Sequence, residues 1–208
     1  MGFTAEDFAK VTDVSRETFE KLALYGATLE KWQAAKNLVA GTTIADMWQR
    51  HFYDSAQLAP LIREHSAFTS PTMADIGAGA GFPGLVLALM GVGHVRLIEA
   101  NGRKCSFLRQ VIQQTGSEMA LVDNRRVEAI EDVSVDIIVS RACASVSQLL
   151  MWGLPLLGEK GEFWLLKGEK LEEELTEAAR SWKMDIKRFP SQTDAGGAVV
   201  RLQNIAAL

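Results

Sequence analysis

The chain has 208 residues, of which 48% are hydrophobic and 23% are charged, and this composition fits one globular unit with a sizeable core. The same figures exclude disordered, collagen-like and low-complexity chains. No apolar run approaches the roughly 20 residues that a bilayer span requires. The first ten residues also lack the charged-then-apolar pattern of an export signal. We therefore expect a soluble protein of the cytoplasm.

Cysteine, histidine and net charge narrow the function classes further. Cys105 and Cys143 are too few for a disulfide framework, which agrees with a reducing compartment. The three histidines show no metal-ligand spacing, so we expect no metal site. A net charge of -4 gives no overall attraction to polyanions, and a nucleic-acid partner would have to meet a local basic patch.

The first 70 residues predict helices packed on the rest of the chain. Between Val14 and about Leu38 the apolar residues recur at spacings of three and four, which is typical of an amphipathic helix: Phe19, Leu22, Tyr25, Leu29 and Trp32. A second helical stretch is expected from Ile44 to Arg63, with three charged residues spaced to pair along one face: Asp46, Arg50 and Asp54. Pro60 and the turn at Ser70-Pro71-Thr72 predict boundaries.

After Pro71, short apolar stretches alternate with helical patterns, which predicts βαβ units and a parallel sheet in residues 71–208. Seven strands are expected: Met73–Ile76, Val95–Glu99, Met119–Val122, Val135–Val139, Phe163–Leu166, Met184–Phe189 and Ala198–Leu202. The last two follow one another across a loop that contains Gly196-Gly197 and is too short for a helix. We therefore expect that pair to be antiparallel.

Helices are expected between these strands. One opens at Pro83, and a charged one runs from Lys170 to Trp182. Another ends before Gly116 and carries an apolar stripe: Phe107, Leu108, Val111 and Ile112.

The sharpest local feature is the run from Asp75 to Gly84, DIGAGAGFPG, placed where a strand ends and a helix begins. Glycines allow tight turns and close approach of the backbone to a ligand, and the following helix directs free N–H groups at it. In open α/β sheets ligands bind at this place. Residues 79–84 also match the dinucleotide pattern GxGxxG, so the loop alone leaves two cofactor classes open.

Three observations favour S-adenosylmethionine over a dinucleotide. Asp75 suits a methionine ammonium group and would repel a diphosphate; we expect its side chain at the strand end rather than in the core. The loop follows about 70 residues of predicted helix, and an antiparallel end pair departs from the six-strand dinucleotide order. Glu99 closes the second strand, where it can accept from both ribose hydroxyls of either ligand. A tight turn without any ligand and a nicotinamide-dependent oxidoreductase remain the alternatives.

The sequence resembles the small-subunit (16S) ribosomal RNA guanine-N7 methyltransferases, also called glucose-inhibited division protein B. The matching pieces run in the family's order from about residue 17 to 170: Trp32 through Asn37-Leu38, Arg50-His51, Asp54-Ser55, the run from Asp75 to Gly84, Lys104, Phe107-Leu108-Arg109, Arg126-Val127-Glu128, Ser140-Arg141-Ala142 and Lys167-Gly168. The resemblance implies a Rossmann-like class I methyltransferase fold and a chain that binds S-adenosylmethionine.

Cofactor-binding residues follow from the loop and the resemblance together. The loop and the second strand supply Asp75, Gly79, Gly81 and Glu99. The resemblance adds Gly77, Phe82, Val127, Glu128 and Arg141. A solvated carboxylate at a helix start is the alternative for Glu128, and a salt bridge without a ligand is the alternative for Arg141.

Two positions depart from the family pattern. Cys143 stands where an aromatic residue is expected, and we interpret it as a small core cysteine. Gly196-Gly197 replaces a basic residue before the last strand, which puts in doubt an RNA contact at the C-terminal edge.

Guanine N7 carries a free lone pair, so its methylation needs orientation rather than a general base. We therefore assign Arg141 and Lys167 as orienting donors. The candidate RNA contacts are Arg50, His51, Lys104, Arg109 and Arg126, for which surface ion pairs or solvated helix faces are the alternative. The expected partner is small-subunit ribosomal RNA, within a small subunit or an assembly intermediate, bound by a monomer. Methylation of a small molecule or a protein, and a non-catalytic interaction module, stay open as alternatives.

Overall fold

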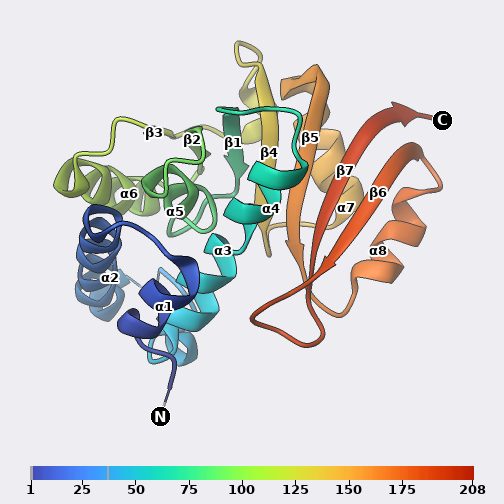
Figure 1. Cartoon of the computed structure of the whole chain (residues 1–208). Helices are drawn as coiled ribbons and strands as arrows, with labels where there is room; N and C mark the ends of the chain where they lie inside the picture. Colours follow the sequence, from blue (N-terminus) through green and yellow to red (C-terminus); the bar gives the residue numbers. More distant parts are fainter. Residues whose placement is uncertain (1, 37) are drawn as a thin grey trace.

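In the computed structural model, which describes residues 2–36 and 38–208, a seven-stranded sheet separates two layers of helices (Figure 1). The strands are β1 Thr72–Ile76, β2 His94–Ile98, β3 Ala120–Asp123, β4 Val135–Arg141, β5 Leu157–Lys167, β6 Trp182–Pro190 and β7 Ala198–Ala207. All seven predicted strands are confirmed. Asn37, which belongs to the resemblance given above, lies outside the described residues.

The strand order is β3-β2-β1-β4-β5-β7-β6. Strands β1 to β5 are parallel, whereas β7 lies antiparallel to both β5 and β6. The predicted antiparallel end pair is therefore confirmed. Because parallel strands end at one edge of the sheet, the loops after β1, β2 and β4 meet there, at the lower side of Figure 1.

The helices flank this sheet, with short 3-10 or π-helical turns labelled η. Their bounds are α1 Ala5–Thr12, α2 Arg16–Lys36, η1 Gly41–Thr43, η2 Trp48–Tyr53, α3 Asp54–Ala56, α4 Leu58–His65, α5 Gly84–Leu89, α6 Gly102–Thr115, η3 Val127–Ala129, α7 Val146–Gly153, η4 Leu154–Leu156 and α8 Leu171–Ala178. The predicted helices at Pro83 and before Gly116 are confirmed as α5 and α6. Asn101 caps α6 by accepting from two backbone N–H groups, and Gly116 ends it in the left-handed conformation.

Two predicted helices have the wrong extent. The stretch from Ile44 to Arg63 is broken into a π-helical turn and two short α-helices, and Pro60 lies in the first turn of α4 rather than at a boundary. Proline is tolerated there because the first N–H groups of a helix have no partner within it. The charged helix ends at Ala178, and Trp182 already begins β6. Helices α1 and α7 were not predicted.

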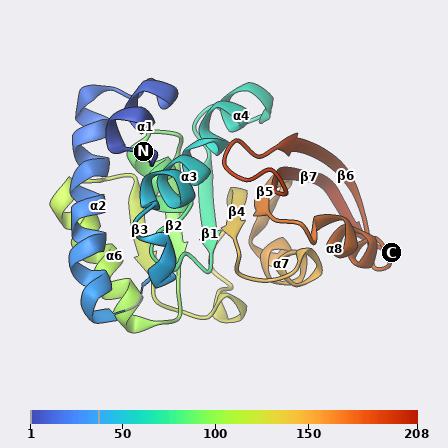
Figure 2. The ribbon, with the colours of Figure 1, turned by 90° about the horizontal axis from the view of Figure 1, so that it is seen from below.

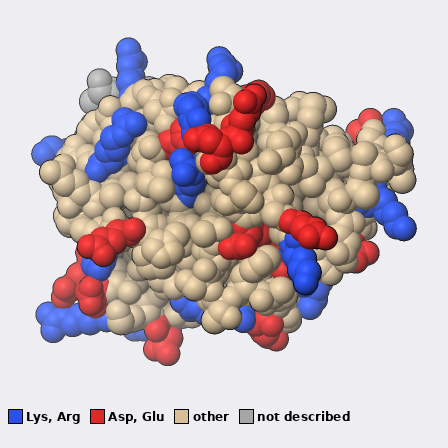
Figure 3. All heavy atoms as spheres, turned by 90° about the horizontal axis from the view of Figure 1, so that it is seen from above, with Lys and Arg blue, Asp and Glu red and all other residues tan. Residues whose placement is uncertain are grey.

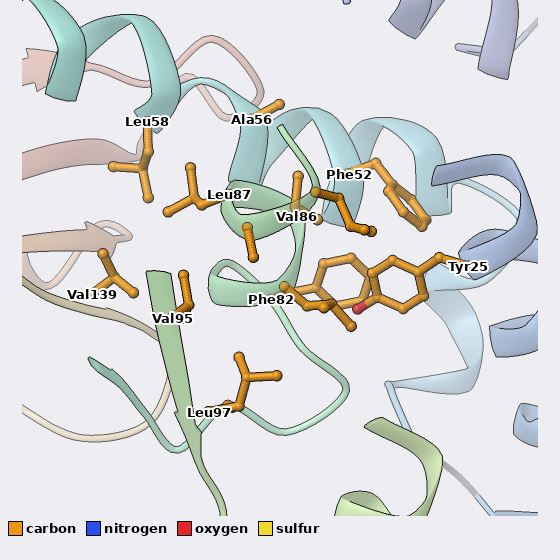
Figure 4. Packing of buried hydrophobic residues seen from close by; sticks show 14 of the residues in the cluster. Tyr25, Phe52, Ala56, Leu58, Phe82, Val86, Leu87, Val95, Leu97 and Val139 are labelled. Atoms are coloured by element: carbon orange, nitrogen blue, oxygen red, sulfur yellow. The ribbon is translucent and has the colours of Figure 1, made fainter. Parts of the chain in front are cut away.

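The N-terminal helices share one hydrophobic core with the helices that cover the sheet (Figure 4). Tyr25 of α2 stacks on Phe82 with ring centroids 5.3 Å apart, and Phe52 packs edge-on against both rings. The hydroxyl of Tyr25 also donates to the carbonyl of Ala80 in the glycine loop. Residues before position 70 thus hold the loop directly. None of the helices in the described part of the chain has the length and apolar character needed to cross a lipid bilayer.

Candidate functional site

A cavity of about 720 Å³ lies where the loops after β1, β2 and β4 meet, on the side of the molecule seen in Figure 2. Its wall combines the glycine loop, the ends of β2 and β4, the turn η3 and the N-terminal segment around η2. Seven of the predicted cofactor residues line it: Gly77, Gly79, Phe82, Glu99, Val127, Glu128 and Arg141. Asp75 and Gly81 do not line it, although both belong to the loop.

Gly77 and Gly79 require glycine for their backbone conformation, with φ of +72° and +59°. The backbone N–H groups of Gly77 and Ala78 both donate to the carbonyl of Ile98 at 3.0 Å, which ties the loop to the end of β2. A Cβ atom on Gly77 would lie 2.2 Å from Sγ of Cys143. The loop therefore leaves no room for a side chain at this point.

Gly81 has a different role from the one predicted. Its φ is +96°, and a Cβ atom there would lie 2.6 Å from the Tyr25 hydroxyl. The missing side chain thus lets α2 approach the loop, and Gly81 serves packing rather than the cavity wall.

The carboxyl group of Asp75 lies in the core, and the expectation of an accessible side chain at the strand end is wrong. Its Oδ2 accepts from the backbone N–H of Gly84 at 2.8 Å, while Oδ1 is buried without a hydrogen-bond partner. Burial raises the pKa of Asp75 to about 7, against the lowering effect of the Gly84 N–H and of Arg141. Asp75 faces α5 because β1 alternates its side chains between the two faces of the sheet.

Glu99 follows β2 and is half-buried on the cavity wall. Its Oε2 accepts from the N–H of Gly79 at 3.0 Å, and its Oε1 accepts from the N–H of Asn101 at 2.7 Å. Each carboxylate oxygen can accept a further hydrogen bond. Glu99 is thus fixed in position and still able to accept from hydroxyl groups in the cavity.

Arg141, at the end of β4, is held by the N-terminal segment. Nη1 donates to the carbonyl of Arg50 at 2.8 Å and to Oδ2 of Asp54 at 3.1 Å, and Nη2 contacts Nδ1 of His51 at 3.0 Å. The guanidinium also lies over the ring of Phe82, 5.2 Å from its centroid. The predicted pairing of Arg50 with Asp46 or Asp54 does not form among the described residues, because Asp54 pairs with Arg141 instead.

His51 lines the cavity, but it does not have the properties expected of an RNA contact. The side chain is buried, stacked on Phe82, and both ring nitrogens have partners. Burial, Arg141 and Arg50 together lower its pKa to about 3. The ring is therefore neutral at physiological pH and offers no positive charge to a phosphate.

A second cavity, of about 390 Å³, adjoins the first. Five residues line both cavities: Asp54, Arg141, Ala142, Cys143 and Asp194. Cys143 is exposed at this junction, so the prediction of a core cysteine is wrong.

Lys167 lines the second cavity with a side chain that is only 6% exposed. Its ammonium group donates to Oε2 of Glu174 at 2.8 Å and to the carbonyl of Ala144. Oε2 of Glu174 also accepts from the N–H of Val146 at 2.9 Å. The pair of Lys167 and Glu174 therefore holds the segment that follows β4.

Besides His51, three of the predicted RNA-contact residues line the first cavity: Arg50, Lys104 and Arg126. Arg109 is exposed on α6 away from its wall. On the opposite side of the molecule, where the parallel strands begin, basic and acidic side chains are intermixed (Figure 3). Among the described residues no cluster of His, Cys, Asp and Glu could hold a metal ion.

Sequence reasoning missed Asp54, Glu174 and Thr193 as parts of the site. Asp54 accepts from Arg141 and, through Oδ1, from the hydroxyl of Thr193 at 2.6 Å. Asp54 and Thr193 are 139 positions apart, so no local sequence pattern could have revealed this contact.

Comparison with known proteins finds relatives over nearly the whole chain. A family model described as rRNA small subunit methyltransferase G matches residues 18–197. A protein named ribosomal RNA small subunit methyltransferase G from Paramagnetospirillum magneticum is 44% identical over 201 residues, covering 97% of this chain and 96% of its own. One of the same name from Rhodospirillum centenum is 47% identical over 204 residues, covering 98% and 92%.

Solved structures share the fold at low sequence identity. The ribosomal protein L11 methylase of Lactobacillus delbrueckii subsp. bulgaricus superimposes with a TM-score of 0.54 and 20% identity, covering 74% of this chain and 78% of its own. The TYW2 protein of M. jannaschii, in complex with AdoMet, gives a TM-score of 0.54 and 16% identity, covering 74% and 77%. The predicted class I methyltransferase fold is confirmed.

Proposed function

Because the chain belongs to the rRNA small subunit methyltransferase G family, we propose that it transfers a methyl group from S-adenosylmethionine to N7 of a guanine in small-subunit ribosomal RNA. The observation that carries this proposal is the pair of adjoining cavities at the end of β4. The first has room and acceptors for the cofactor, and the second opens beside Arg141 and Cys143, where an acceptor base would enter.

The residues of the first cavity fit S-adenosylmethionine better than a dinucleotide. Glu99 and Glu128 are the acidic groups of its wall, and the Asp75 carboxyl, which lies behind the loop and outside the wall, has an unpartnered oxygen. These carboxylates would favour an ammonium group, ribose hydroxyls and an exocyclic amine, and would repel a diphosphate. When bound, the cofactor supplies a methyl group on a positively charged sulfur atom.

For this cofactor, Gly77 and Gly79 give the close backbone approach, and Glu99 accepts from the ribose. Val127 and Phe82 cover apolar surface, and Glu128 accepts from the adenine amine. Asp75 acts from beneath the loop, through its charge and its hold on Gly84, and Gly81 acts through the packing of Tyr25.

The remaining residues orient the base and exclude water. Guanine N7 needs no proton acceptor, so the residues at the junction do not have to move a proton. Arg141 is fixed by three partners and keeps the walls of the two cavities at a constant separation. Lys167 acts indirectly, since it positions the segment after β4 through Ala144 and Glu174.

We assign the RNA contacts to the basic residues at the mouth of the first cavity, Arg50, Lys104 and Arg126, with Arg109 further out on α6. With a net charge of -4, such a patch suits a folded or protein-bound RNA better than a long naked strand. The proposed substrate is therefore the small subunit or an assembly intermediate, and the proposed active form is a monomer.

The test is incubation of the protein with labelled S-adenosylmethionine and small ribosomal subunits from a strain that lacks this methylation. We expect label on one guanine, at N7, when the modified base is mapped. Label on protein or on a free metabolite instead would contradict the proposed substrate.

Calorimetric titration tests the cofactor separately. We expect binding of S-adenosylmethionine and none of NADH, with the reverse result contradicting the assignment. Glu99→Gln should weaken binding of the cofactor, whereas Glu118→Gln, an exposed residue remote from the cavity, should bind as the unmodified chain does.

A further inference from the structure

The second cavity contains three carboxylates, and their environments differ. Both oxygens of Asp54 already accept hydrogen bonds, from Arg141, Thr193 and Gln57. Asp194 is exposed and also lines the first cavity. Glu174 lines the second cavity and not the first.

Glu174 is fixed through one oxygen and free at the other. Oε2 accepts from Lys167 and from the N–H of Val146, while Oε1 has no hydrogen-bond partner among the described residues. Among the described residues, the one side-chain oxygen that is both buried and without a hydrogen-bond partner is Oδ1 of Asp75. The unpartnered Oε1 of Glu174 is thus not a buried atom. Oε1 of Glu174 is therefore accessible from outside. A carboxylate held in this way is a preorganised acceptor.

The chemistry of guanine decides which edge this acceptor meets. N7 and O6 lie on one edge of the base, and the N2 amino group lies on another, across the ring. If N7 is to be methylated, its edge must face the first cavity, which leaves the N1–H and N2 amino donors directed into the second. Adenine would instead present the N1 lone pair to a carboxylate there, which is repulsive.

We propose that the second cavity binds the target guanine and that the free oxygen of Glu174 accepts from its N2 amino group, so that Glu174 selects guanine. This inference rests on the proposed function, because it assumes that the reacting atom is N7. A base without the N2 amino group would leave the carboxylate oxygen unpaired, and such an unpaired polar group is a strong source of discrimination between substrates.

The test replaces the target guanine by inosine, which lacks only the N2 amino group, in reconstituted small subunits. Hydrogen bonds to charged groups contribute about 1.5–3 kcal/mol, so inosine should lower kcat/KM of the unmodified chain about 10-fold to 150-fold. In Glu174→Gln the donors of Lys167 and Val146 hold the amide oxygen, so that the NH2 group faces the base. This variant should lower kcat/KM on guanine by a similar factor and abolish the preference for guanine over inosine. Glu173→Gln, an exposed neighbour on α8, should leave both values unchanged.

The ratio of the rates on guanine and on inosine distinguishes a role of Glu174 in base selection from a purely structural role. If Glu174 only holds Lys167 and the segment after β4, its substitution lowers turnover on guanine and inosine equally and the preference persists. Equal rates of the unmodified chain on the two bases would overturn the proposal without any variant. Absence of methylation at guanine would instead overturn the proposed function and this inference with it.

Discussion

Nη2 of Arg141 lies 3.0 Å from Nδ1 of His51, and because a guanidinium can only donate, this contact determines the protonation of the imidazole. Nδ1 must accept, so the hydrogen of the neutral ring is on Nε2. From there it donates to Oγ1 of Thr43 at 2.8 Å, whose own hydroxyl donates to the carbonyl of Ala40. One chain of hydrogen bonds thus connects the end of β4 to the N-terminal segment.

This arrangement predicts a specific pH dependence of stability. The pKa of His51 is about 3 in the folded chain and 6.5 in its ordinary state, so the unfolded chain binds more protons between those values. The free energy of unfolding should therefore rise with pH from about 3 to 6.5, by at most about 1.4 kcal/mol per pH unit from this residue, and then level off. His51→Gln should remove that contribution when denaturant unfolding is measured across the range. An NMR titration in which the His51 ring protonates near pH 6.5 would contradict the prediction.

Arg141→Lys should destabilise the fold although it keeps the charge. A lysine cannot reach His51, Asp54 and the carbonyl of Arg50 together, and we expect a loss of about 1–3 kcal/mol in the free energy of unfolding. The matched control is Arg188→Lys, whose partner Glu172 is on the surface, and its effect should stay within about 0.5 kcal/mol. If the two substitutions had equal effects on chemical denaturation, the contacts of Arg141 would stabilise the fold no more than a surface ion pair does.

Asp75 should respond to pH in the opposite sense. Its pKa is raised from 3.8 to about 7 by burial, so the folded chain binds more protons between these values and stability falls as pH rises through them. Asp75→Asn keeps an acceptor for the Gly84 N–H and should gain stability relative to the unmodified chain from pH 4 to 8. Asp75→Ala leaves that N–H unpaired and should cost about 1–3 kcal/mol.

The proposed electrostatic role of Asp75 has a separate measurement. A nearby cationic ligand favours the ionised carboxyl, so affinity for S-adenosylmethionine should increase as pH rises through about 7, and Asp75→Asn should remove this dependence. Calorimetry at several pH values tests it. A steep pH dependence that persists in the variant would assign the effect to another group.

Gly77 and Gly91 allow the effect of backbone strain to be separated from the effect of a steric clash. Both have positive φ, so alanine should cost each about 1–2 kcal/mol in backbone strain. A Cβ atom on Gly91 has nothing within 4 Å, whereas one on Gly77 meets Sγ of Cys143 at 2.2 Å. Gly77→Ala should therefore lose further stability and cofactor affinity, and Gly91→Ala should keep its affinity. Adding Cys143→Ala to Gly77→Ala should restore part of the loss in thermal unfolding, since the sulfur atom is removed.

The amino-acid sequence alone predicted the seven strands, the antiparallel end pair and the glycine loop between β1 and α5. These features depend on interactions among neighbours: alternation of apolar residues, and glycines where φ must be positive. It also placed Gly79 and Glu99 on the first cavity's wall, because loops after parallel strands are brought to one edge by topology itself. The family resemblance supplied the other cofactor residues of that wall: Gly77, Phe82, Val127, Glu128 and Arg141.

The tertiary structure decided burial and the choice of partners. The sequence spacing allowed Asp54 to pair with Arg50, four positions away. In the structure it pairs with Arg141, 87 positions away, because the end of β4 approaches η2 only in the folded chain. Other tertiary contacts buried the carboxyl of Asp75, kept His51 neutral and exposed Cys143. Whether a polar group is accessible, charged or paired depends on residues distant in the sequence, and no local pattern records them.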